Sequence, residues 1–213
     1  MTALLLDIEG TTTSISFVYD VLFPYARAEL GAFVEASWAT DETQRDVQAL
    51  LDLHAAEPDT DRDARIGPAA PTPEWIAGWL LHLMDSDRKV TPLKSLQGRV
   101  WREGYASGAL RGHVYDDVAP MLRARSRAGR PTCIYSSGSV EAQKLLFAHS
   151  VAGDLTPHLS GYFDTTTGPK REAGSYAAIA AALDLPPGRV TFCTDVIEEA
   201  LAARAAGMQT RLV

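Results

Sequence analysis

The sequence predicts an α/β fold: a Rossmann-like parallel-sheet core with a helical cap domain inserted after the first strand. Three observations lead to this prediction. An apolar run near the N-terminus ends at Asp7, strand and helix patterns alternate from residue 116 onward, and about a hundred residues separate Thr13 from Tyr115. A parallel crossover needs only about a dozen residues. We therefore expect a catalytic core at residues 1–20 and 115–213, and a cap at residues 21–114.

The first strand is the apolar run Leu4 to Leu6. Three consecutive leucines are typical of a strand covered on both faces, as in a parallel sheet. Gly10 and the three threonines that follow it then end the strand.

The inserted segment has helical patterns throughout. One apolar helix face comprises Trp75, Ile76, Trp79, Leu80 and Leu83. The expected helices cover residues 24–37, 41–56, 73–87 and 92–110. Proline lies at or near the start of the third and fourth, and Asp41 is the expected cap of the second. The polar, proline-rich residues 57–73 are expected to form a loop. A cap of this kind can close over a substrate and exclude water.

The remaining residues alternate between strand and helix patterns. The expected strands cover residues 131–135, 161–165, 189–195 and 210–213, and the expected helices cover 116–129, 140–149, 175–185 and 196–207. This order predicts a parallel sheet with right-handed crossovers and helices on both faces.

Composition excludes several classes of function. The 213 residues are 46% hydrophobic and carry a formal charge of -7, which argues against binding to nucleic acid or to an anionic membrane. The sequence shows neither a secretory signal nor an apolar run of about 18 residues. Cys133 and Cys193 lie in apolar runs, as expected for buried thiols in a reducing compartment. We therefore expect a cytoplasmic protein.

Polar groups follow four of the predicted strands. Their residues are Asp7 and Glu9; Ser136, Ser137 and Gly138; Lys170; and Asp195, followed by Glu198 and Glu199. Because the carboxyl ends of parallel strands share one edge of the sheet, these groups are expected to meet there. Each has an ordinary alternative explanation: Asp7 as a turn former, Lys170 as a solvated loop residue, or Asp195 as a helix cap. These alternatives do not explain why all four groups share one position in the topology.

Phosphoryl transfer through an aspartyl phosphate uses this combination of groups. Asp7 would be the nucleophile, and Glu9 would donate and accept protons. Carboxylates at Asp7 and Asp195, with the backbone carbonyl of Glu9, are suitable ligands for Mg²⁺. Lys170 would neutralise developing charge. The serine hydroxyls at 136 and 137, with amides such as that of Gly138, would hold phosphate oxygens.

Several segments resemble the enolase-phosphatase (acireductone synthase) family of the haloacid dehalogenase-like hydrolase superfamily. They are DIEGTTTSISFVYDVLFPYA, LKSLQGRVWREGYASGAL, YSSGSVEAQKLLF, GYFDT with GPK, and TDVIEEALAARAAGM. The resemblance extends from near the N-terminus to about Met208. Members of this family usually continue past the last strand, whereas this sequence ends at Val213. We expect the site to be intact because its four loops are present.

The resemblance implies a Mg²⁺-dependent, bifunctional enzyme of methionine salvage. Such an enzyme enolises 2,3-diketo-5-methylthiopentyl-1-phosphate and then dephosphorylates it to the acireductone 1,2-dihydroxy-3-keto-5-methylthiopentene. It implies that Asp7, Glu9 and Lys170 are catalytic, and that Asp7, Glu9 and Asp195 bind the metal. Ser136, Ser137 and Lys170 correspond to substrate-binding positions. The resemblance also implies a monomer.

Two other functions stay open. The chain could be a phosphatase of the same superfamily that acts on another small phosphomonoester, although Glu9 and the serine block argue against this. It could also be a non-catalytic binding protein on the same fold. Loss of a catalytic acid would indicate such a protein, and none of the expected acids is lost. A dehalogenase function is less well supported than these two, because that reaction needs neither the second acid nor a metal.

Overall fold

The computed structural model describes residues 2–56 and 71–213, which form two compact units. One unit comprises residues 2–20 and 107–213, and the other comprises the described part of residues 21–106. The predicted α/β fold with a helical insertion after the first strand is confirmed. The predicted functional division into core and cap stays a prediction. The loop predicted at residues 57–73 lies mostly outside the described residues.

The first unit contains a five-stranded parallel sheet in the order β3-β2-β1-β4-β5. Its strands are β1 (Ala3–Leu6), β2 (Thr132–Tyr135), β3 (Gly161–Phe163), β4 (Val190–Thr194) and β5 (Gln209–Leu212). β1 is central, and Leu6 pairs in register with Ile134 on one side and with Cys193 on the other. The carboxyl ends of β1, β2 and β4 therefore lie side by side.

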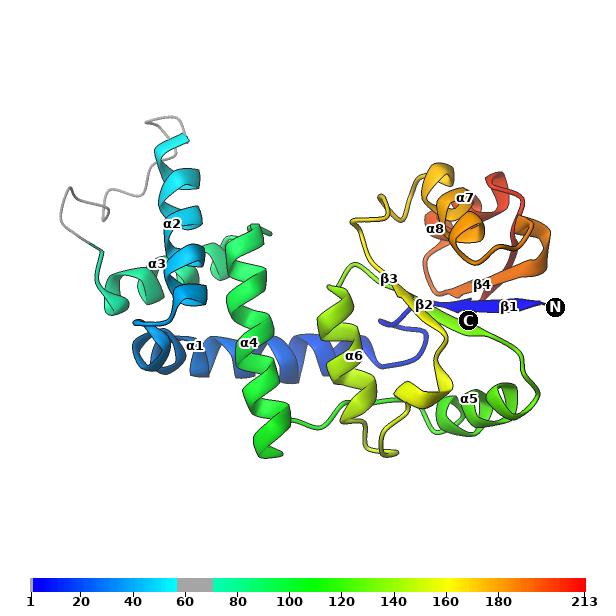
Figure 1. Cartoon of the computed structure of the whole chain (residues 1–213), viewed down its shortest axis with the longest axis horizontal. Helices are drawn as coiled ribbons and strands as arrows, with labels where there is room; N and C mark the ends of the chain where they lie inside the picture. Colours follow the sequence, from blue (N-terminus) through cyan, green and yellow to red (C-terminus); the bar gives the residue numbers. More distant parts are fainter. Residues whose placement is uncertain (1, 57–70) are drawn as a thin grey trace. The chain divides into compact units, whose positions relative to one another are not determined.

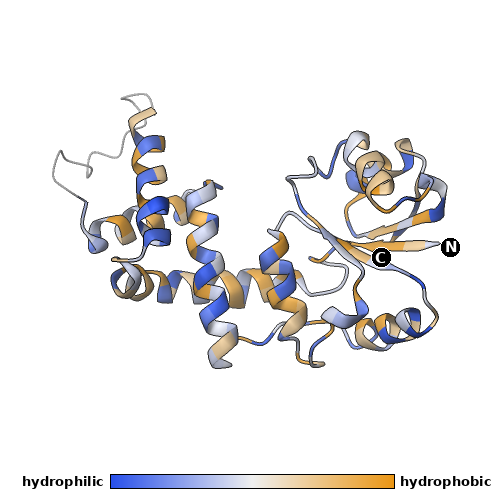
Figure 2. Ribbon diagram, in the orientation of Figure 1, coloured by the Kyte–Doolittle hydropathy of each residue, from blue (hydrophilic) through white to orange (hydrophobic). Residues whose placement is uncertain are grey.

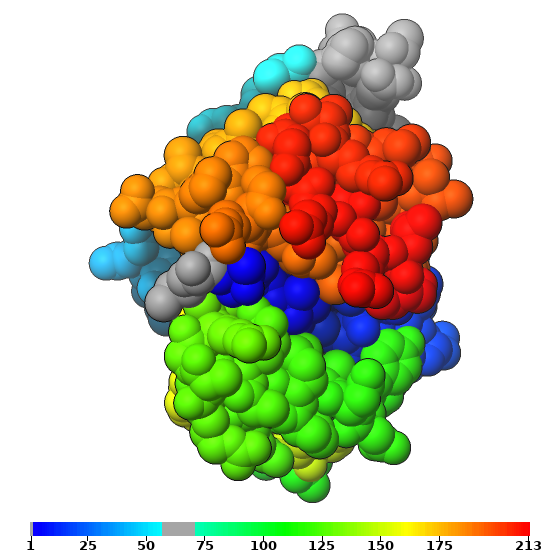
Figure 3. All heavy atoms as spheres, turned by 90° about the vertical axis from the view of Figure 1, so that its right-hand side faces the viewer, coloured from blue at the N-terminus to red at the C-terminus, as the bar shows by residue number. Residues whose placement is uncertain are grey.

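Helices cover both faces of this sheet. They are α5 (Val118–Arg127), α6 (Val140–Ala148), α7 (Ala173–Ala182) and α8 (Ile197–Ala205). α7 and α8 lie on one face, and α5 and α6 lie on the other (Figure 1). In the space-filling view, N-terminal residues of this unit (blue) lie between the segment that contains α5 (green) and the C-terminal segment (red) (Figure 3). The right-handed crossovers predicted from the sequence would place helices on both faces in this way.

Apolar residues on the central strands hold this unit together. Leu5, Cys133, Tyr135 and Phe192 are fully buried, and the central strands are correspondingly hydrophobic in Figure 2. Tyr176 of α7 packs against the rings of Tyr135 and Phe192, with ring centroids 5.5 and 5.1 Å apart. Burial of each large side chain of this kind stabilises the fold by roughly 1.5–3 kcal/mol. The loops at the strand ends thus follow strands that are packed in a hydrophobic core.

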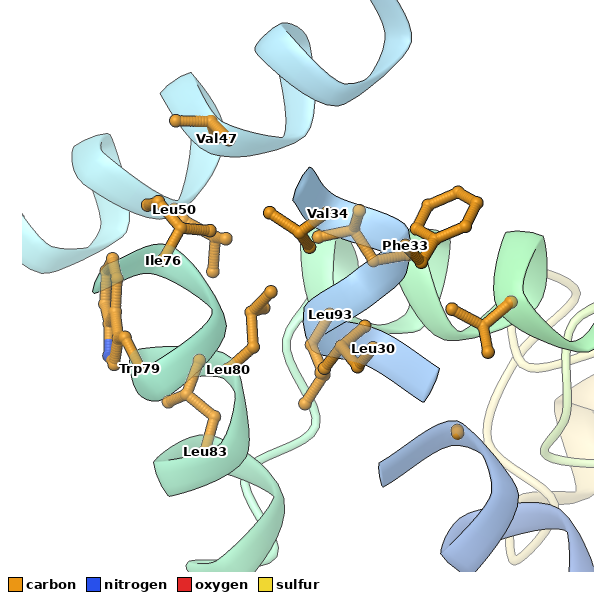
Figure 4. Packing of buried hydrophobic residues seen from close by; sticks show 13 residues of the cluster. Leu30, Phe33, Val34, Val47, Leu50, Ile76, Trp79, Leu80, Leu83 and Leu93 are labelled. Atoms are coloured by element: carbon orange, nitrogen blue, oxygen red, sulfur yellow. The ribbon is translucent and has the colours of Figure 1, made fainter. Parts of the chain in front are cut away.

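The second unit contains four helices in its described part: α1 (Phe23–Ser37), α2 (Asp41–Ala56), α3 (Pro73–Asp85) and α4 (Thr91–Ser107). Leu30 and Val34 of α1 pack with Leu50 of α2 and Leu80 of α3 in one apolar cluster (Figure 4). The apolar face predicted for residues 75–83 contributes Ile76, Trp79, Leu80 and Leu83 to it. A π-helix, Phe17–Leu22, precedes α1 and was not predicted.

One predicted helix cap is wrong. α2 begins at Asp41, but the hydroxyl of Thr40 accepts the hydrogen bond from the Thr43 amide at 3.3 Å. Thr40 is therefore the capping residue, and Asp41 lies in the first turn, where its charge is favourable for the helix dipole. In α3 the predicted start is correct, because Pro73 follows the N-cap Thr72, whose hydroxyl accepts from Trp75.

No helix in the described residues is both long enough and apolar enough to cross a membrane.

Candidate active site

The site starts where β1 ends. Asp7 is only 2% exposed, and its amide donates to the carbonyl of Cys193 on β4. One carboxylate oxygen, Oδ1, accepts from the Ile8 amide at 2.8 Å, and the other, Oδ2, accepts from the Thr194 hydroxyl at 3.0 Å. These contacts fix the orientation of a buried carboxylate at the edge of the sheet.

Lys170 forms ion pairs with two carboxylates in this position. Its Nζ lies 2.6 Å from Oδ1 of Asp7 and 2.7 Å from Oε2 of Glu199. Burial by itself would lower the pKa of Lys170, but the neighbouring charges of Asp7 and Glu199 outweigh it and raise this pKa. The ammonium is therefore charged at neutral pH.

The loop that carries Lys170 is held by hydroxyl groups. Tyr176 donates to the Lys170 carbonyl at 2.7 Å, Tyr135 donates to the Gly168 carbonyl at 2.8 Å, and Ser175 donates to the Pro169 carbonyl at 2.7 Å. Gly168 has φ +145, and a β-carbon there would lie 2.3 Å from the Ser175 hydroxyl oxygen. Only glycine fits this turn without a shift of its neighbours.

Glu9 lies next to the first serine of the loop after β2. Ser136 is buried, and its hydroxyl lies 3.4 Å from Oε2 of Glu9. The Gly138 amide donates to the Ser136 hydroxyl at 3.1 Å, whereas Ser137 is exposed. Burial, with a smaller contribution from the charge of Asp7, raises the pKa of Glu9. A carboxyl group with a raised pKa can hold a proton closer to neutral pH than a free glutamate can.

Asp195 follows β4 and packs against the turn after β1. A β-carbon at Gly10 would lie only 2.1 Å from Oδ2 of Asp195, and Gly10 has φ +75. Asp195 does not cap α8: the N-cap is Val196, and its amide donates to the Thr194 hydroxyl. The Oδ1 atom of Asp195 is buried and has no hydrogen-bond partner in the described part of the chain. The helix-cap alternative for Asp195 is therefore not supported.

The oxygen atoms of this region are suitable ligands for a hard cation. Within residues 2–56 and 71–213, no three histidine, cysteine, aspartate or glutamate side chains form a ready metal cluster. The donor set expected from the sequence instead combines two carboxylates, Asp7 and Asp195, with the Glu9 carbonyl. No described residue donates a hydrogen bond to that carbonyl. The orphaned Asp195 oxygen and this free carbonyl fit a Mg²⁺ ion that retains several waters.

Glu199 is a site residue to which the sequence reasoning gave no role. It is 8% exposed, pairs with Lys170, and lies 3.3 Å from the Thr194 hydroxyl. Burial and the charge of Asp7 raise the pKa of Glu199 to about 6. The signal was its position four residues after Asp195, one turn into α8. Glu198 is exposed.

The geometry brings the predicted strand-end groups together. Asp7 contacts Lys170, Glu9 contacts Ser136, and Asp195 lies against the Gly10 turn. Negative groups outnumber the cation, because two carboxylates, those of Asp7 and Glu199, pair with one lysine. Such a surplus suits a site that takes up a divalent cation, because carboxylates in close proximity repel one another.

Comparisons with known proteins agree with this geometry. Residues 1–207 match the sequence profile of haloacid dehalogenase-like hydrolases. The chain is 52% identical over 211 residues to Enolase-phosphatase E1 of Drosophila mojavensis, covering 98% of this chain and 83% of the relative. It is 51% identical over 219 residues to Enolase-phosphatase E1 of Synechococcus elongatus, covering 100% of this chain and 88% of the relative.

A solved structure has the same fold throughout. The UTR4 protein of Saccharomyces cerevisiae superposes with a TM-score of 0.81 at 32% identity, covering 99% of this chain and 88% of that protein. With a share of identical residues above one half over nearly its whole length, the chain belongs to the haloacid dehalogenase-like hydrolases and, within them, to the enolase-phosphatase family.

Proposed function

We propose that this chain enolises 2,3-diketo-5-methylthiopentyl-1-phosphate and then dephosphorylates it to the acireductone 1,2-dihydroxy-3-keto-5-methylthiopentene, in methionine salvage. Sequence identities of 52% and 51% to two enolase-phosphatases support this substrate. The observation that carries the proposal is the buried Asp7 carboxylate, which Lys170 and Thr194 hold at the end of β1. A carboxylate fixed in this way is a suitable nucleophile toward phosphorus.

In the phosphatase half-reaction, an oxygen of Asp7 attacks phosphorus and the bond between phosphorus and the substrate oxygen breaks. Glu9 gives its proton to the departing oxygen, and its raised pKa supports this role. Water then attacks the aspartyl phosphate, Glu9 accepts a proton from that water, and phosphate leaves as Asp7 is regenerated. Lys170 reduces the repulsion between Asp7 and the phosphate because its ammonium forms an ion pair with Oδ1 of Asp7.

Phosphate oxygens are held by the loop after β2. The proposed donors are the Ser136 hydroxyl, which the Gly138 amide holds in place, and unpaired backbone amides of this loop such as that of Ser137. In the enolase half-reaction, Glu9 is the proposed carrier of the proton, because it is the acid of the site that lies beside this loop with a raised pKa.

Mg²⁺ is the proposed cofactor, held by Asp7, Asp195 and Glu9, the last through its backbone carbonyl. When bound, it would neutralise phosphate charge and polarise a keto oxygen of the substrate. The unpartnered Asp195 oxygen supports this assignment.

We further propose that residues 21–114 act as a cap that excludes water, and that the enzyme is a cytoplasmic monomer acting on small molecules. The resemblance to enolase-phosphatases supports these assignments, and the net charge of -7 argues against nucleic acid as a partner.

The test is a spectrophotometric assay on the diketo phosphate, with phosphate release measured in parallel. The expected result is an enediol signal together with phosphate release, and loss of both in excess chelator with recovery on adding Mg²⁺. A folded protein that is inert toward the diketo phosphate but hydrolyses other small phosphomonoesters would instead be a phosphatase of different specificity. Undiminished activity in excess chelator would remove Mg²⁺ from the account.

A further inference from the structure

The side chain of Gln143 ties together the ends of two strands behind the serine loop. Gln143 lies on α6 and is only 1% exposed. Its Nε2 donates to the Gly138 carbonyl at 2.8 Å and to the Phe163 carbonyl at 2.8 Å. Phe163 ends β3, and its carbonyl also accepts from the Ser136 amide. One buried amide thus connects the loop after β2 to the end of β3.

The backbone donors of this loop divide into two sets. Three are used within the protein: Ser136 donates to Phe163, Gly138 donates to the Ser136 hydroxyl, and Val140 donates to Asp164. The amides of Ser137 and Ser139 have no partner within the described ranges. These two N–H groups are therefore available to an anion at the start of α6.

Gln143 fixes the direction of one of these two donors. In a trans peptide, the carbonyl and the N–H of the same plane point in opposite directions. Because Gln143 holds the Gly138 carbonyl on the buried side, the Ser139 N–H of the same peptide must point away from Gln143. Without that bond the peptide could rotate and present a carbonyl oxygen, which would repel phosphate.

The Gln143 amide is satisfied on one side only. Its Oε1 is buried with no hydrogen-bond partner in the residues described. A buried, unsatisfied acceptor destabilises a fold, and each such group calls for an explanation. A hydrophobic side chain of similar length would avoid this cost, so the two donated bonds are the reason to place glutamine here.

We propose that Gln143 is a positioning residue for phosphate binding, which holds the peptide between Gly138 and Ser139 so that its N–H faces the phosphate. This inference rests on the proposed function of the serine loop. Gln143 itself does not touch the substrate.

The first experiment compares Gln143→Met with the matched control Lys144→Met, an exposed neighbour on the same helix. The Kd of orthovanadate, a phosphate analogue, is measured with Mg²⁺ present, together with kcat, KM and thermal unfolding. Gln143→Met is expected to weaken vanadate binding and to lower kcat, each on the order of tenfold, because the Ser139 N–H is no longer held toward the phosphate. Lys144→Met is expected to match the wild type in all four quantities.

The second experiment uses Gln143→Glu. A glutamate carboxylate has no donor for the two carbonyls, whereas the protonated acid regains one O–H donor. The kcat of this variant relative to the wild type is therefore expected to rise as the pH falls, while the ratio for Gln143→Met stays flat. This pH profile also decides the question if Gln143→Met does not fold.

Each outcome separates the two proposals. Vanadate affinity and kcat equal to the wild type in folded Gln143→Met, or a flat pH ratio for Gln143→Glu, would overturn the role of Gln143 while the wild-type activity stands. Wild-type protein inert toward the diketo phosphate would instead overturn the proposed function, and the vanadate affinities would still test Gln143.

Discussion

Each of the two units contains a buried cation, and the surroundings of these cations differ. In the inserted helical unit, Arg99 of α4 contacts Asp46 and the Thr43 hydroxyl of α2, and its guanidinium lies 5.3 Å from the centroid of the Phe33 ring. Ser95 donates to the same Asp46 oxygen at 2.8 Å. In the sheet-containing unit, Lys170 contacts two carboxylates, those of Asp7 and Glu199.

The two clusters differ in their net charge and in the elements that carry their charged groups. Arg99 has one close acid, Asp46, while Glu42 is at 3.9 Å and largely exposed. The cluster is neutral because one close acid balances Arg99. Its charged groups lie on regular helices, and their contacts join α2 to α4. The lysine cluster has a surplus of negative charge: Asp7 and Lys170 lie on loops that follow strands, and Glu199 lies in the first turn of α8. A balanced cluster is typical of a structural role, whereas a surplus of charge of one sign is typical of a functional site.

The largest effect is expected at Asp7, the proposed nucleophile. Asp7→Asn preserves shape but removes the attacking oxygen, so phosphate release is expected to fall by on the order of 10⁴-fold or more. Steady-state phosphate release and circular dichroism measure activity and folding. Asp117→Asn, at an exposed site before α5, is the control. Near-normal turnover in folded Asp7→Asn would remove Asp7 as the nucleophile.

A smaller effect is expected at the residue that holds the lysine. Glu199→Gln weakens the grip on Lys170, so kcat is expected to fall by about 10- to 100-fold, as for other residues that orient a catalytic group. Because the pKa of Glu199 is raised to about 6, the wild-type kcat should decline as the pH falls below that value and Glu199 loses its charge. Glu199→Gln should lack this decline.

The neighbouring Glu198→Gln is the matched control, since Glu198 is exposed on the same turn of α8. Equal kcat values for the two variants across the pH range would show that the pairing with Lys170 is not used in catalysis.

The smallest effect on catalysis is expected in the inserted unit. Arg99→Met leaves Asp46 without its partner and is expected to lower the free energy of unfolding by about 3 kcal/mol, measured by urea titration. Where the variant is folded, its kcat should stay near the wild-type value. The double variant Arg99→Met with Asp46→Leu removes both charges and should recover much of the lost stability. A large loss of kcat in folded Arg99→Met would contradict the structural role assigned to this cluster.

Most of the site in the sheet-containing unit could be predicted from the sequence. Apolar runs that end in Asp7 and Asp195 predict both strand positions and their shared edge, because parallel topology leaves few alternatives. The helix cap at Asp41 was wrong because Thr40 and Asp41 are both good capping residues, and only backbone geometry distinguishes them.

Two features could not be predicted for a physical reason. The pairing of Glu199 with Lys170, and the bonds from Gln143 to Gly138 and Phe163, depend on side-chain directions across separate elements. Periodicity places Glu199 and Gln143 on their helices but does not show which groups they meet. Charge balance in a buried cluster is likewise a property of the folded chain.

The central claim is that the carboxylate beside Lys170 carries the phosphoryl group. The most direct measurement is mass spectrometry of peptides from enzyme quenched in acid during turnover of the diketo phosphate with Mg²⁺. The account predicts one added phosphoryl group on the peptide that contains Asp7, and none on that peptide from Asp7→Asn. A phosphoryl group found on a different residue, or turnover with no phosphorylated peptide under quench conditions that preserve acyl phosphates, would contradict it.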